Sequence, residues 1–208
     1  MASGTVIRSF AAPSDSPRDL AFDGRCLWNL DTTTNRIYQI DPETGTVIRS
    51  FAIPTTTPHG LTFDGRYLWY SDMGTDRIYQ VDPETGTIIR SFIAPALWGR
   101  GLTFDGRCLW HTDYIANIIY QVDPETGTVI RSFASPGDYP MGLAFDGRCL
   151  WNCDSGTDRI YQIDPETGTV IRSFAAPAAN PMGLTFDGRC LWHTDNTAQV
   201  NLIYQINL

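Results

Sequence analysis

The sequence predicts an all-β protein, a five-bladed β-propeller of four-stranded antiparallel blades. One stretch of the type Gly-Leu-Thr-Phe-Asp-Gly-Arg-Cys-Leu-Trp occurs five times, and its tryptophans are each 41 positions from the next. Short β-rich runs bounded by turn residues flank every copy. Four antiparallel strands in roughly 40 residues are typical of propeller blades. We interpret the tryptophans as packing between blades. They are Trp28, Trp69, Trp110, Trp151 and Trp192.

The first repeat shows the order of elements within a blade. An inner strand at 20–22 leads into Asp-Gly, for which we expect a type I′ turn with positive φ at both central residues. A second strand at 26–31 and a third at 37–41 follow. The link Pro-Glu-Thr-Gly then has turn chemistry and leads to an outer strand at 46–51.

The two ends of the chain together supply one blade. The last repeat contains only three strands, whereas the chain begins with a copy of the outer strand at 5–10. Pairing these two segments removes an open sheet edge, so we expect the N-terminal strand to close the last blade. The prediction is a single domain over 1–208, with blades at 18–51, 59–92, 100–133, 141–174, and 182–208 plus 4–10.

The amino-acid composition excludes two classes of binding partner, nucleic acids and membranes. The chain of 208 residues is 42% hydrophobic and 18% charged, with a net charge of −8, and all fifteen of its cations are arginines. Nucleic-acid binders carry clustered basic residues, so we expect no nucleic-acid partner. No apolar run approaches the roughly 20 residues of a membrane span, and we expect no membrane contact. The five cysteines have no partners within disulfide reach, which favours a cytoplasmic protein, and we expect a monomer.

The copies differ from one another on one face of the disc. The Asp-Gly-Arg and Asp-Pro-Glu-Thr-Gly turns are invariant, whereas the loops between outer and next inner strand, and between second and third strand, vary. In an antiparallel blade these variable loops emerge together, and we call that side the top face. One interpretation is that the sequences of these loops have diverged because surface loops tolerate substitution. The alternative is a ligand site built from unlike loops.

Three groups of top-face residues are candidates for such a site. The first lies at the start of the inner strands, at the mouth of the central channel, where its cations could hold an anion or zwitterion or pair with nearby aspartates. It comprises Arg18, His59, Arg100, Met141 and Met182. The second is an aromatic group that breaks the repeat and could stack on a ligand. It comprises Trp98, Tyr114 and Tyr139.

The third group is a ring of carboxylates at the end of the second strands. Such residues either cap their own turns or hold a hard cation with oxygen ligands. They are Asp31, Asp72, Asp113, Asp154 and Asp195. His111 and His193 occupy a second-strand position that also accepts Asn and Tyr, as in a hydrogen-bonding slot between blades, although both remain candidates for ligand binding. Their blades are not adjacent, which disfavours zinc. We expect no cofactor beyond a cation or anion in the channel.

The blade pattern resembles known propellers. Gly-Leu-x-Phe-Asp-Gly-x-x-Leu-Trp-x-x-Asp followed by Arg-Ile-Tyr-Gln-Ile-Asp-Pro-Glu-Thr-Gly is similar to the blades of streptogramin lyases and NHL-repeat proteins, and to those of the five-bladed glutamine cyclotransferases. The cyclotransferase resemblance implies a catalytic glutamate before the Gly-Leu of an inner strand. The matching positions here are the channel-mouth group, which has no glutamate. The lyase resemblance implies a histidine and a glutamate with magnesium. The glutamates of this chain all lie in the invariant turns: Glu43, Glu84, Glu125 and Glu166.

These observations lead to one functional expectation and one alternative. Because one blade type hosts many functions, and because the catalytic residues of both families are unmatched, we expect a non-enzymatic scaffold or binding module. Its blades, recently amplified or engineered from one repeat, would bind a small ligand or a protein partner on the top face. The alternative is a lyase- or glutaminyl-cyclotransferase-like enzyme that uses His59, His111 or His193 as a base.

Overall fold

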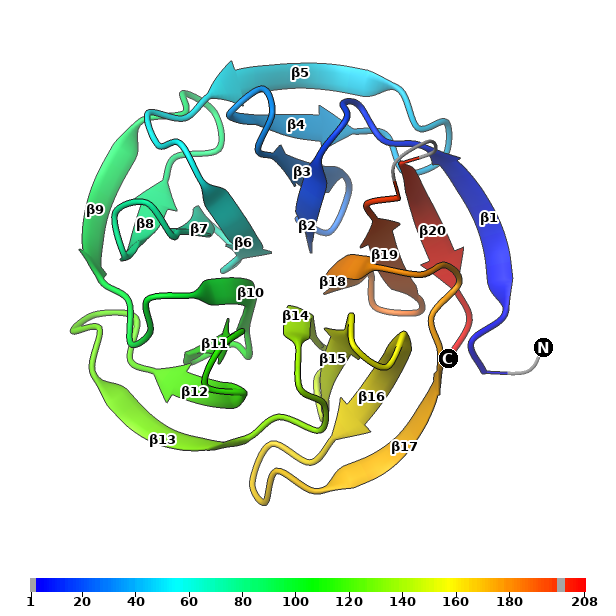
Figure 1. The fold of residues 1–208 in the computed structure, drawn as a ribbon. Helices are drawn as coiled ribbons and strands as arrows, with labels where there is room; N and C mark the ends of the chain where they lie inside the picture. Colours follow the sequence, from blue (N-terminus) through cyan, green and yellow to red (C-terminus); the bar gives the residue numbers. More distant parts are fainter. Residues whose placement is uncertain (1–2, 198–200) are drawn as a thin grey trace.

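The protein is a closed ring of five sheets around a central axis (Figure 1). The computed structural model describes residues 3–197 and 201–208, and this part of the chain contains twenty strands and no helix. Every sheet has four antiparallel strands, which confirms the predicted propeller. Among the described residues there is no helix of the length and apolarity that a membrane crossing requires.

Each blade runs from an inner strand beside the axis to an outer strand at the rim. Blade 1 contains β2 (Pro17–Phe22), β3 (Leu27–Asp31), β4 (Arg36–Ile40) and β5 (Val47–Ala52). Blade 2 contains β6 (Pro58–Phe63), β7 (Leu68–Asp72), β8 (Arg77–Val81) and β9 (Ile88–Ile93). Blade 3 contains β10 (Gly99–Phe104), β11 (Leu109–Asp113), β12 (Ile118–Val122) and β13 (Val129–Ala134). Blade 4 contains β14 (Pro140–Phe145), β15 (Leu150–Asp154), β16 (Arg159–Ile163) and β17 (Val170–Ala175). Blade 5 contains β18 (Pro181–Phe186), β19 (Leu191–Asp195), β20 (Leu202–Ile206) and β1 (Val6–Ala11).

The N-terminal strand closes the ring, as the sequence predicts. β1 pairs antiparallel with β20, with Phe10 opposite Ile203 and Arg8 opposite Gln205. The inner strands contact their neighbours all the way round, including β18 against β2. The inner strands begin earlier than expected: β2 starts at Pro17, with an irregular register between Pro17 and Leu20.

The hairpin turns after the inner strands differ from the expected type I′. Positive φ occurs at Gly24, with a value of 92°, but not at Asp23. The reason is that the Asp23 carboxylate accepts the backbone N–H groups of Arg25 and Cys26 at 2.8 and 2.6 Å, so Gly24 and Arg25 are the two central residues. Glycine at the first central position with positive φ is the pattern of a type II′ turn.

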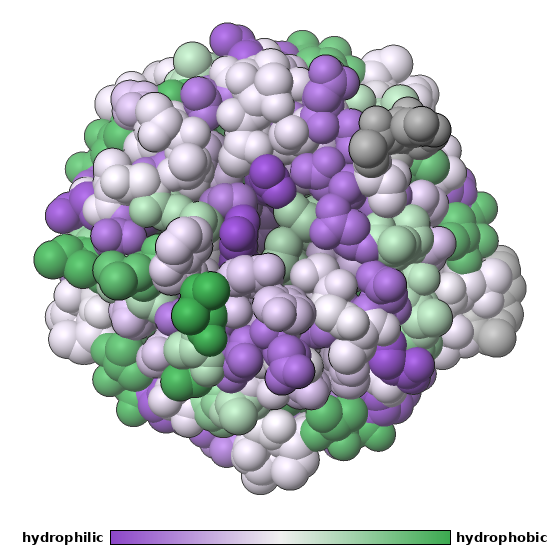
Figure 2. Space-filling model, viewed as in Figure 1, coloured by the Kyte–Doolittle hydropathy of each residue, from purple (hydrophilic) through white to green (hydrophobic). Residues whose placement is uncertain are grey.

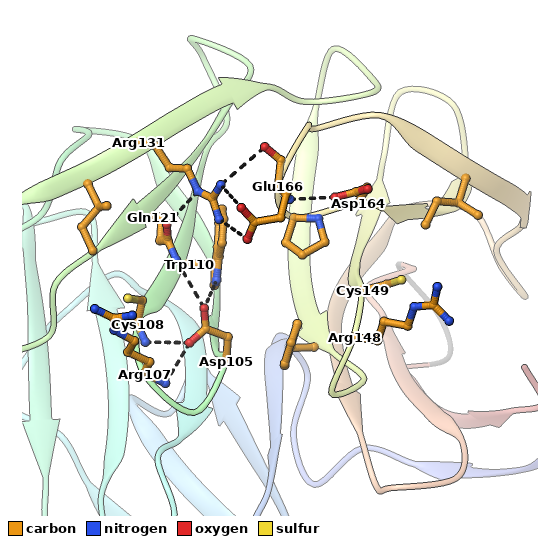
Figure 3. Close-up of a pocket in the computed structure, with 14 residues that line it drawn as sticks. Asp105, Arg107, Cys108, Trp110, Gln121, Arg131, Arg148, Cys149, Asp164 and Glu166 are labelled. Atoms are coloured by element: carbon orange, nitrogen blue, oxygen red, sulfur yellow. Dashed lines mark hydrogen bonds and ion pairs between the residues drawn. The ribbon is translucent and has the colours of Figure 1, made fainter.

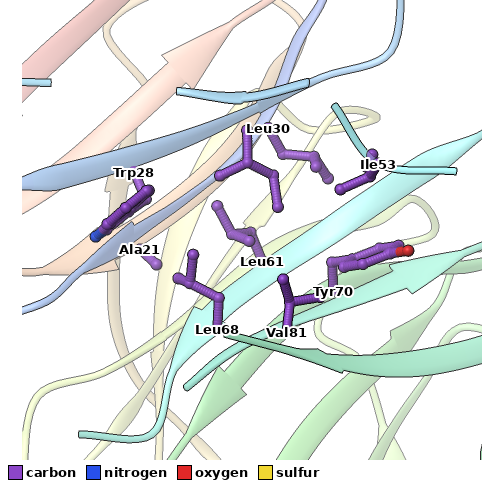
Figure 4. Packing of buried hydrophobic residues seen from close by; sticks show 9 residues of the cluster. Ala21, Trp28, Leu30, Ile53, Leu61, Leu68, Tyr70 and Val81 are labelled. Atoms are coloured by element: carbon purple, nitrogen blue, oxygen red, sulfur yellow. The ribbon is translucent and has the colours of Figure 1, made fainter. Parts of the chain in front are cut away.

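The recurrent tryptophans pack between blades, as predicted. Trp28 and Leu30 of β3 lie against Leu61 and Leu68 of the next blade (Figure 4). All five are 1% exposed or less, and each indole N–H is satisfied by the aspartate of its own inner turn. Trp28 Nε1, for example, donates to Asp23 Oδ2 at 2.8 Å. The invariant Asp-Gly-Arg turn therefore fixes both the hairpin and the interface side chain.

An ion pair joins four of the blade boundaries at the rim. The outer-strand arginine of one blade meets the glutamate of the invariant turn in the next, as in Arg49 to Glu84 at 2.8 Å. The same guanidinium lies over the indole of Trp28, 5.4 Å from the ring centre. These contacts, which we call Arg–Glu clasps, place every glutamate of the chain away from the top face. The other three clasps are Arg8–Glu43, Arg90–Glu125 and Arg131–Glu166.

Candidate functional site

The variable loops meet on the top face. In blade 1, the backbone N–H of Thr32, after β3, donates to the carbonyl of Ser16, before β2, at 3.2 Å. Equivalent bonds of 3.0 to 3.4 Å join the two loops in the other four blades. The space-filling view shows this face hollowed at its centre, with hydrophilic residues around the hollow (Figure 2).

Three polar side chains of the inner strands converge at the channel mouth. Arg18 comes from β2, His59 from β6 and Arg100 from β10, and each stands two residues before the first leucine of its strand. Nη1 of Arg100 lies 3.0 Å from Nδ1 and 2.9 Å from Nε2 of His59. Arg18 donates from Nε to the Thr32 hydroxyl at 3.0 Å. Met141 and Met182, both nearly buried, occupy the same position in the remaining two blades.

The electrostatics of this mouth are unusual for an acidic protein. Burial, followed by the charges of Arg100 and Arg18, lowers the pKa of His59 from 6.5 to about 2, so the imidazole is neutral. Burial and then Arg18 lower the pKa of Arg100 to about 10, against an opposing effect of Tyr114. Within the described part of the chain, neither Arg18 nor Arg100 forms an ion pair with a carboxylate. Two guanidiniums and a neutral imidazole thus lie together at the mouth, and among the described residues neither guanidinium is ion-paired with a carboxylate.

A buried carboxylate lies on the axis just below the mouth. Asp19 is 1% exposed and replaces the glycine that the other four repeats have at this position. Its two oxygens accept backbone N–H groups from four blades, at 2.9 to 3.4 Å. Burial raises the pKa of Asp19 well above its usual value, and the four N–H bonds act against that rise. The donors are the N–H groups of Leu20, Leu61, Leu102 and Leu184.

The aromatic group adjoins the mouth on the side of blade 3. The Arg100 guanidinium lies over the ring of Tyr114, 4.8 Å from its centre. The rings of Tyr114 and Tyr139 are 5.2 Å apart, and the N–H of Tyr114 donates to the carbonyl of Trp98 at 3.0 Å. The indole of Trp98 is 47% exposed, so this group continues from the mouth onto the open surface.

The ring of aspartates at the ends of the second strands is engaged in capping. Asp31 accepts the N–H and hydroxyl of Thr34 at one oxygen and the N–H of Ser16 at the other, each at 2.8 Å. Asp72, Asp113, Asp154 and Asp195 likewise accept bonds from their own loops. No cluster of three or more metal-ligating side chains occurs among residues 3–197 and 201–208.

His111 and His193 lie inside the blades rather than on the top surface. Both are 0% exposed, and their Nδ1 atoms lie 3.2 and 3.1 Å from the carbonyl oxygens of Gly101 and Gly183. Asn29 makes the same contact in blade 1, where its Nδ2 donates to the Asp19 carbonyl at 3.2 Å. This arrangement is the interior hydrogen-bonding slot, and it leaves His59 as the histidine at the mouth.

Three grooves lie between blades on the opposite face. One of about 720 Å³ separates blades 3 and 4 and contains the Arg131–Glu166 clasp and the Asp105–Trp110 bond (Figure 3). Smaller grooves of about 520 and 290 Å³ repeat it at other blade boundaries, lined by the same repeat positions. Because their residues are the invariant turn and interface residues, we assign these grooves to the scaffold.

Two features of the site escaped the sequence reasoning. The role of Asp19 was missed, although it is the one non-glycine residue at its repeat position and that signal was present. The direct contact between His59 and Arg100 was not foreseen either, because side chains 41 residues apart meet only when neighbouring inner strands are in register.

Comparisons with known proteins agree on the fold. Glutaminyl cyclase from Myxococcus xanthus has a TM-score of 0.81 at 14% identity, covering 98% of this chain and 95% of that chain. Virginiamycin B lyase from Staphylococcus aureus has a TM-score of 0.58 at 22% identity, covering 96% and 68%. A chain of a nidogen–laminin complex has a TM-score of 0.66 at 23% identity, covering 88% and 73%. A comparison with curated proteins found no match.

The family comparison corrects the functional expectation. The sequence pattern of the glutamine cyclotransferase family matches residues 54–181, which span blades 2, 3 and 4. The expectation of a non-enzymatic scaffold is therefore wrong, and the finding favours the enzyme alternative. The family pattern extends over whole blades, so the absence of a glutamate at the starts of the inner strands does not exclude the chain from the family. This match over more than half of its length shows that the chain belongs to the glutamine cyclotransferase family.

Proposed function

We propose that the protein cyclises an amino-terminal glutamine, with release of ammonia, at the mouth formed by Arg18, His59 and Arg100. The observation that carries the proposal is the pair of guanidiniums, without a carboxylate partner among the described residues, beside a neutral imidazole. By the cyclotransferase resemblance, His59 stands at an inner-strand position where a glutamate would be expected. The family match supports the reaction class.

The chemistry divides among these side chains. The lone pair of the substrate α-amine attacks the side-chain carboxamide carbon, a C–N bond forms, and the carbonyl electrons move to oxygen. Arg18 and Arg100 donate hydrogen bonds to that oxygen as its negative charge develops. A proton then passes from the attacking nitrogen to the carboxamide nitrogen, the second C–N bond breaks, and ammonia leaves. The proton passes within the substrate, because an imidazole with a pKa of about 2 does not hold it, and the neutral His59 orients the attacking amine through a hydrogen bond.

The positive charge of the mouth also selects the reactive form of the substrate. An α-ammonium group has a pKa of about 8 in water, and only the neutral amine is nucleophilic. Two nearby guanidiniums disfavour the ammonium, so the bound substrate loses its proton more readily than it does in water. His59 stays neutral over the whole physiological range because its pKa is about 2.

The test is ammonia release from a glutaminyl peptide, with the pyroglutamyl product identified by mass spectrometry. Arg100→Gln, Arg18→Gln and His59→Gln are each expected to lower kcat/KM by about 100-fold or more. The matched control is Arg148→Gln, an exposed arginine of an invariant turn on the opposite face, which should leave the rate unchanged. The acid side of the pH profile should follow the substrate amine alone. Absence of turnover, or full activity of all three mouth variants, would refute the proposal.

A further inference from the structure

One sector of the top face is apolar. Leu97, Trp98, Ile115 and Tyr139 are 65, 47, 60 and 45% exposed, and we call them the blade 3 shelf. Leu97, Trp98 and Tyr139 belong to the loops that enter blades 3 and 4, and Ile115 follows β11. Figure 2 shows hydrophobic surface over blade 3 beside the central hollow, and more at the rim near the end of β9. Such a concentration of exposed apolar side chains on one side of a site marks a binding surface.

The repeat itself provides the control for this observation. At the position of Leu97, the other blades have Asp15, Thr56, Asp138 and Ala179. At the position of Trp98, they have Ser16, Thr57, Tyr139 and Asn180. At the position of Ile115, they have Thr33, Gly74, Gly156 and Thr197. Large aliphatic side chains and tryptophan at these positions are therefore not required by the fold, since the other blades form without them.

The shelf is continuous with the mouth. Arg100 is two residues after Trp98, and its guanidinium lies over Tyr114, whose ring in turn contacts Tyr139. Tyr114 also fixes the loop of Trp98 through the 3.0 Å bond between its N–H and the Trp98 carbonyl. A ligand that extends outward from Arg100 past Tyr114 therefore approaches the loop that carries Trp98 and the ring of Tyr139.

We propose that the blade 3 shelf receives the side chain of the second residue of the substrate and selects glutaminyl peptides in which that residue is large and apolar. This inference rests on the proposed function, which places the glutamine itself in the mouth. The peptide continues from the glutamine α-carbonyl, next to the reacting amine, so its second residue lies at the rim of the mouth. A phenylalanine or leucine there buries apolar surface against Leu97, Trp98 and Ile115, whereas glycine, serine or glutamate gains nothing.

The experiment measures kcat/KM for a series of peptides Gln-Xaa-Ala-amide, with Gly, Ser, Glu, Leu or Phe as the second residue. The protein should prefer Phe and Leu over Gly by about tenfold, as expected for one apolar side chain in a partly open site. The variant Leu97→Thr, Trp98→Thr, Ile115→Gly carries the residues of blade 2. It should lose this preference and retain the rate on the glycine peptide. Thermal unfolding of both proteins verifies that the variant is folded, and Trp98→Thr alone serves if the triple variant is not.

A second measurement does not depend on turnover. Five of the six tryptophans are buried, so quenching of fluorescence by acrylamide reports mainly on Trp98. The reaction product pyroglutamyl-Phe-Ala-amide should protect Trp98 from quenching, and pyroglutamyl-Gly-Ala-amide should not. Turnover of all peptides at equal rates, or a preference that survives in the variant, would overturn the shelf and leave the proposed function standing. No turnover of any peptide would refute the proposed function, and equal quenching with both products would overturn the shelf independently.

Discussion

His111 and His193 each contribute to the acid sensitivity of the native state, and replacing both with asparagine should remove their contribution. Each imidazole is fully buried and leaves its Nε2 without a hydrogen-bond partner. Asn29 and Asn152 occupy the same slot in blades 1 and 4, bond to the equivalent carbonyl oxygen, and leave one amide oxygen without a partner. The substitution therefore keeps the hydrogen bond and removes only the titratable group.

The magnitude follows from the two pKa values. Burial lowers the pKa of His111 and of His193 from 6.5 to about 4, against the opposing effect of the carbonyl bond. Below pH 6.5 the unfolded chain binds protons that the native protein does not, so the free energy of unfolding falls as the pH falls. Over the interval down to about pH 4, each histidine costs about 3 kcal/mol, or about 6 kcal/mol for the pair.

Urea unfolding, followed by circular dichroism at several pH values between about 7 and 4, compares the two proteins. At neutral pH the double variant should be slightly less stable, because asparagine is smaller than histidine and leaves a small cavity. That cost does not depend on pH and cancels in the slope. His59 and Asp19 titrate in both proteins and cancel as well. Parallel pH profiles for the two proteins would refute the reasoning, and either single variant should recover about half of the difference.

Three further changes test the scaffold. Asp19→Gly installs the residue of the other four repeats and should lower the melting temperature, because four backbone N–H groups lose their acceptor. Chloride can accept bonds from the same N–H groups and should restore part of the loss, whereas an unchanged melting temperature would contradict this role of Asp19. Arg49→Ala should destabilise the protein more than Glu84→Ala, since the arginine also covers a tryptophan whereas an exposed ion pair contributes little; equal losses in thermal unfolding would argue against this. Gly127→Ala should be far more damaging than Gly106→Ala, because both have positive φ but only the first Cβ would meet a phenylalanine, at 2.6 Å; urea unfolding decides between them.

The architecture was readable from the sequence because five copies carry the same signals. Residues typical of turns, such as Asp-Gly-Arg at Asp23, occur at the strand boundaries of every repeat. Five copies at a period of 41 residues give the number of blades. The turn type was wrong because the backbone conformation depends on which N–H groups the Asp23 carboxylate accepts, and a dipeptide preference does not specify that.

The site was readable only in part, since its residues come from different blades. The convergence of Arg18, His59 and Arg100 follows from the ring geometry, and the sequence placed them together. The sequence does not predict their charge states, because the low pKa of His59 arises from burial and from two guanidiniums whose positions depend on the tertiary structure. The buried position of His111 and His193 also depends on how blades pack, which the local pattern leaves open.

The pairing of β1 with β20 has a consequence for how the chain finds its native state. β1, β5, β13 and β17 have the same six residues, Val-Ile-Arg-Ser-Phe-Ala. Short turns tether β5, β13 and β17 to their partners, whereas β1 must find a partner almost the whole chain away. The side chains of β1 therefore do not distinguish the edge of β20 from the edges of the other blades that bind an identical outer strand. The chain connectivity and the order in which strands pair decide which edge β1 occupies. The first strand of one molecule can pair in the same register with β20 of another, so refolding at high protein concentration should yield strand-exchanged dimers.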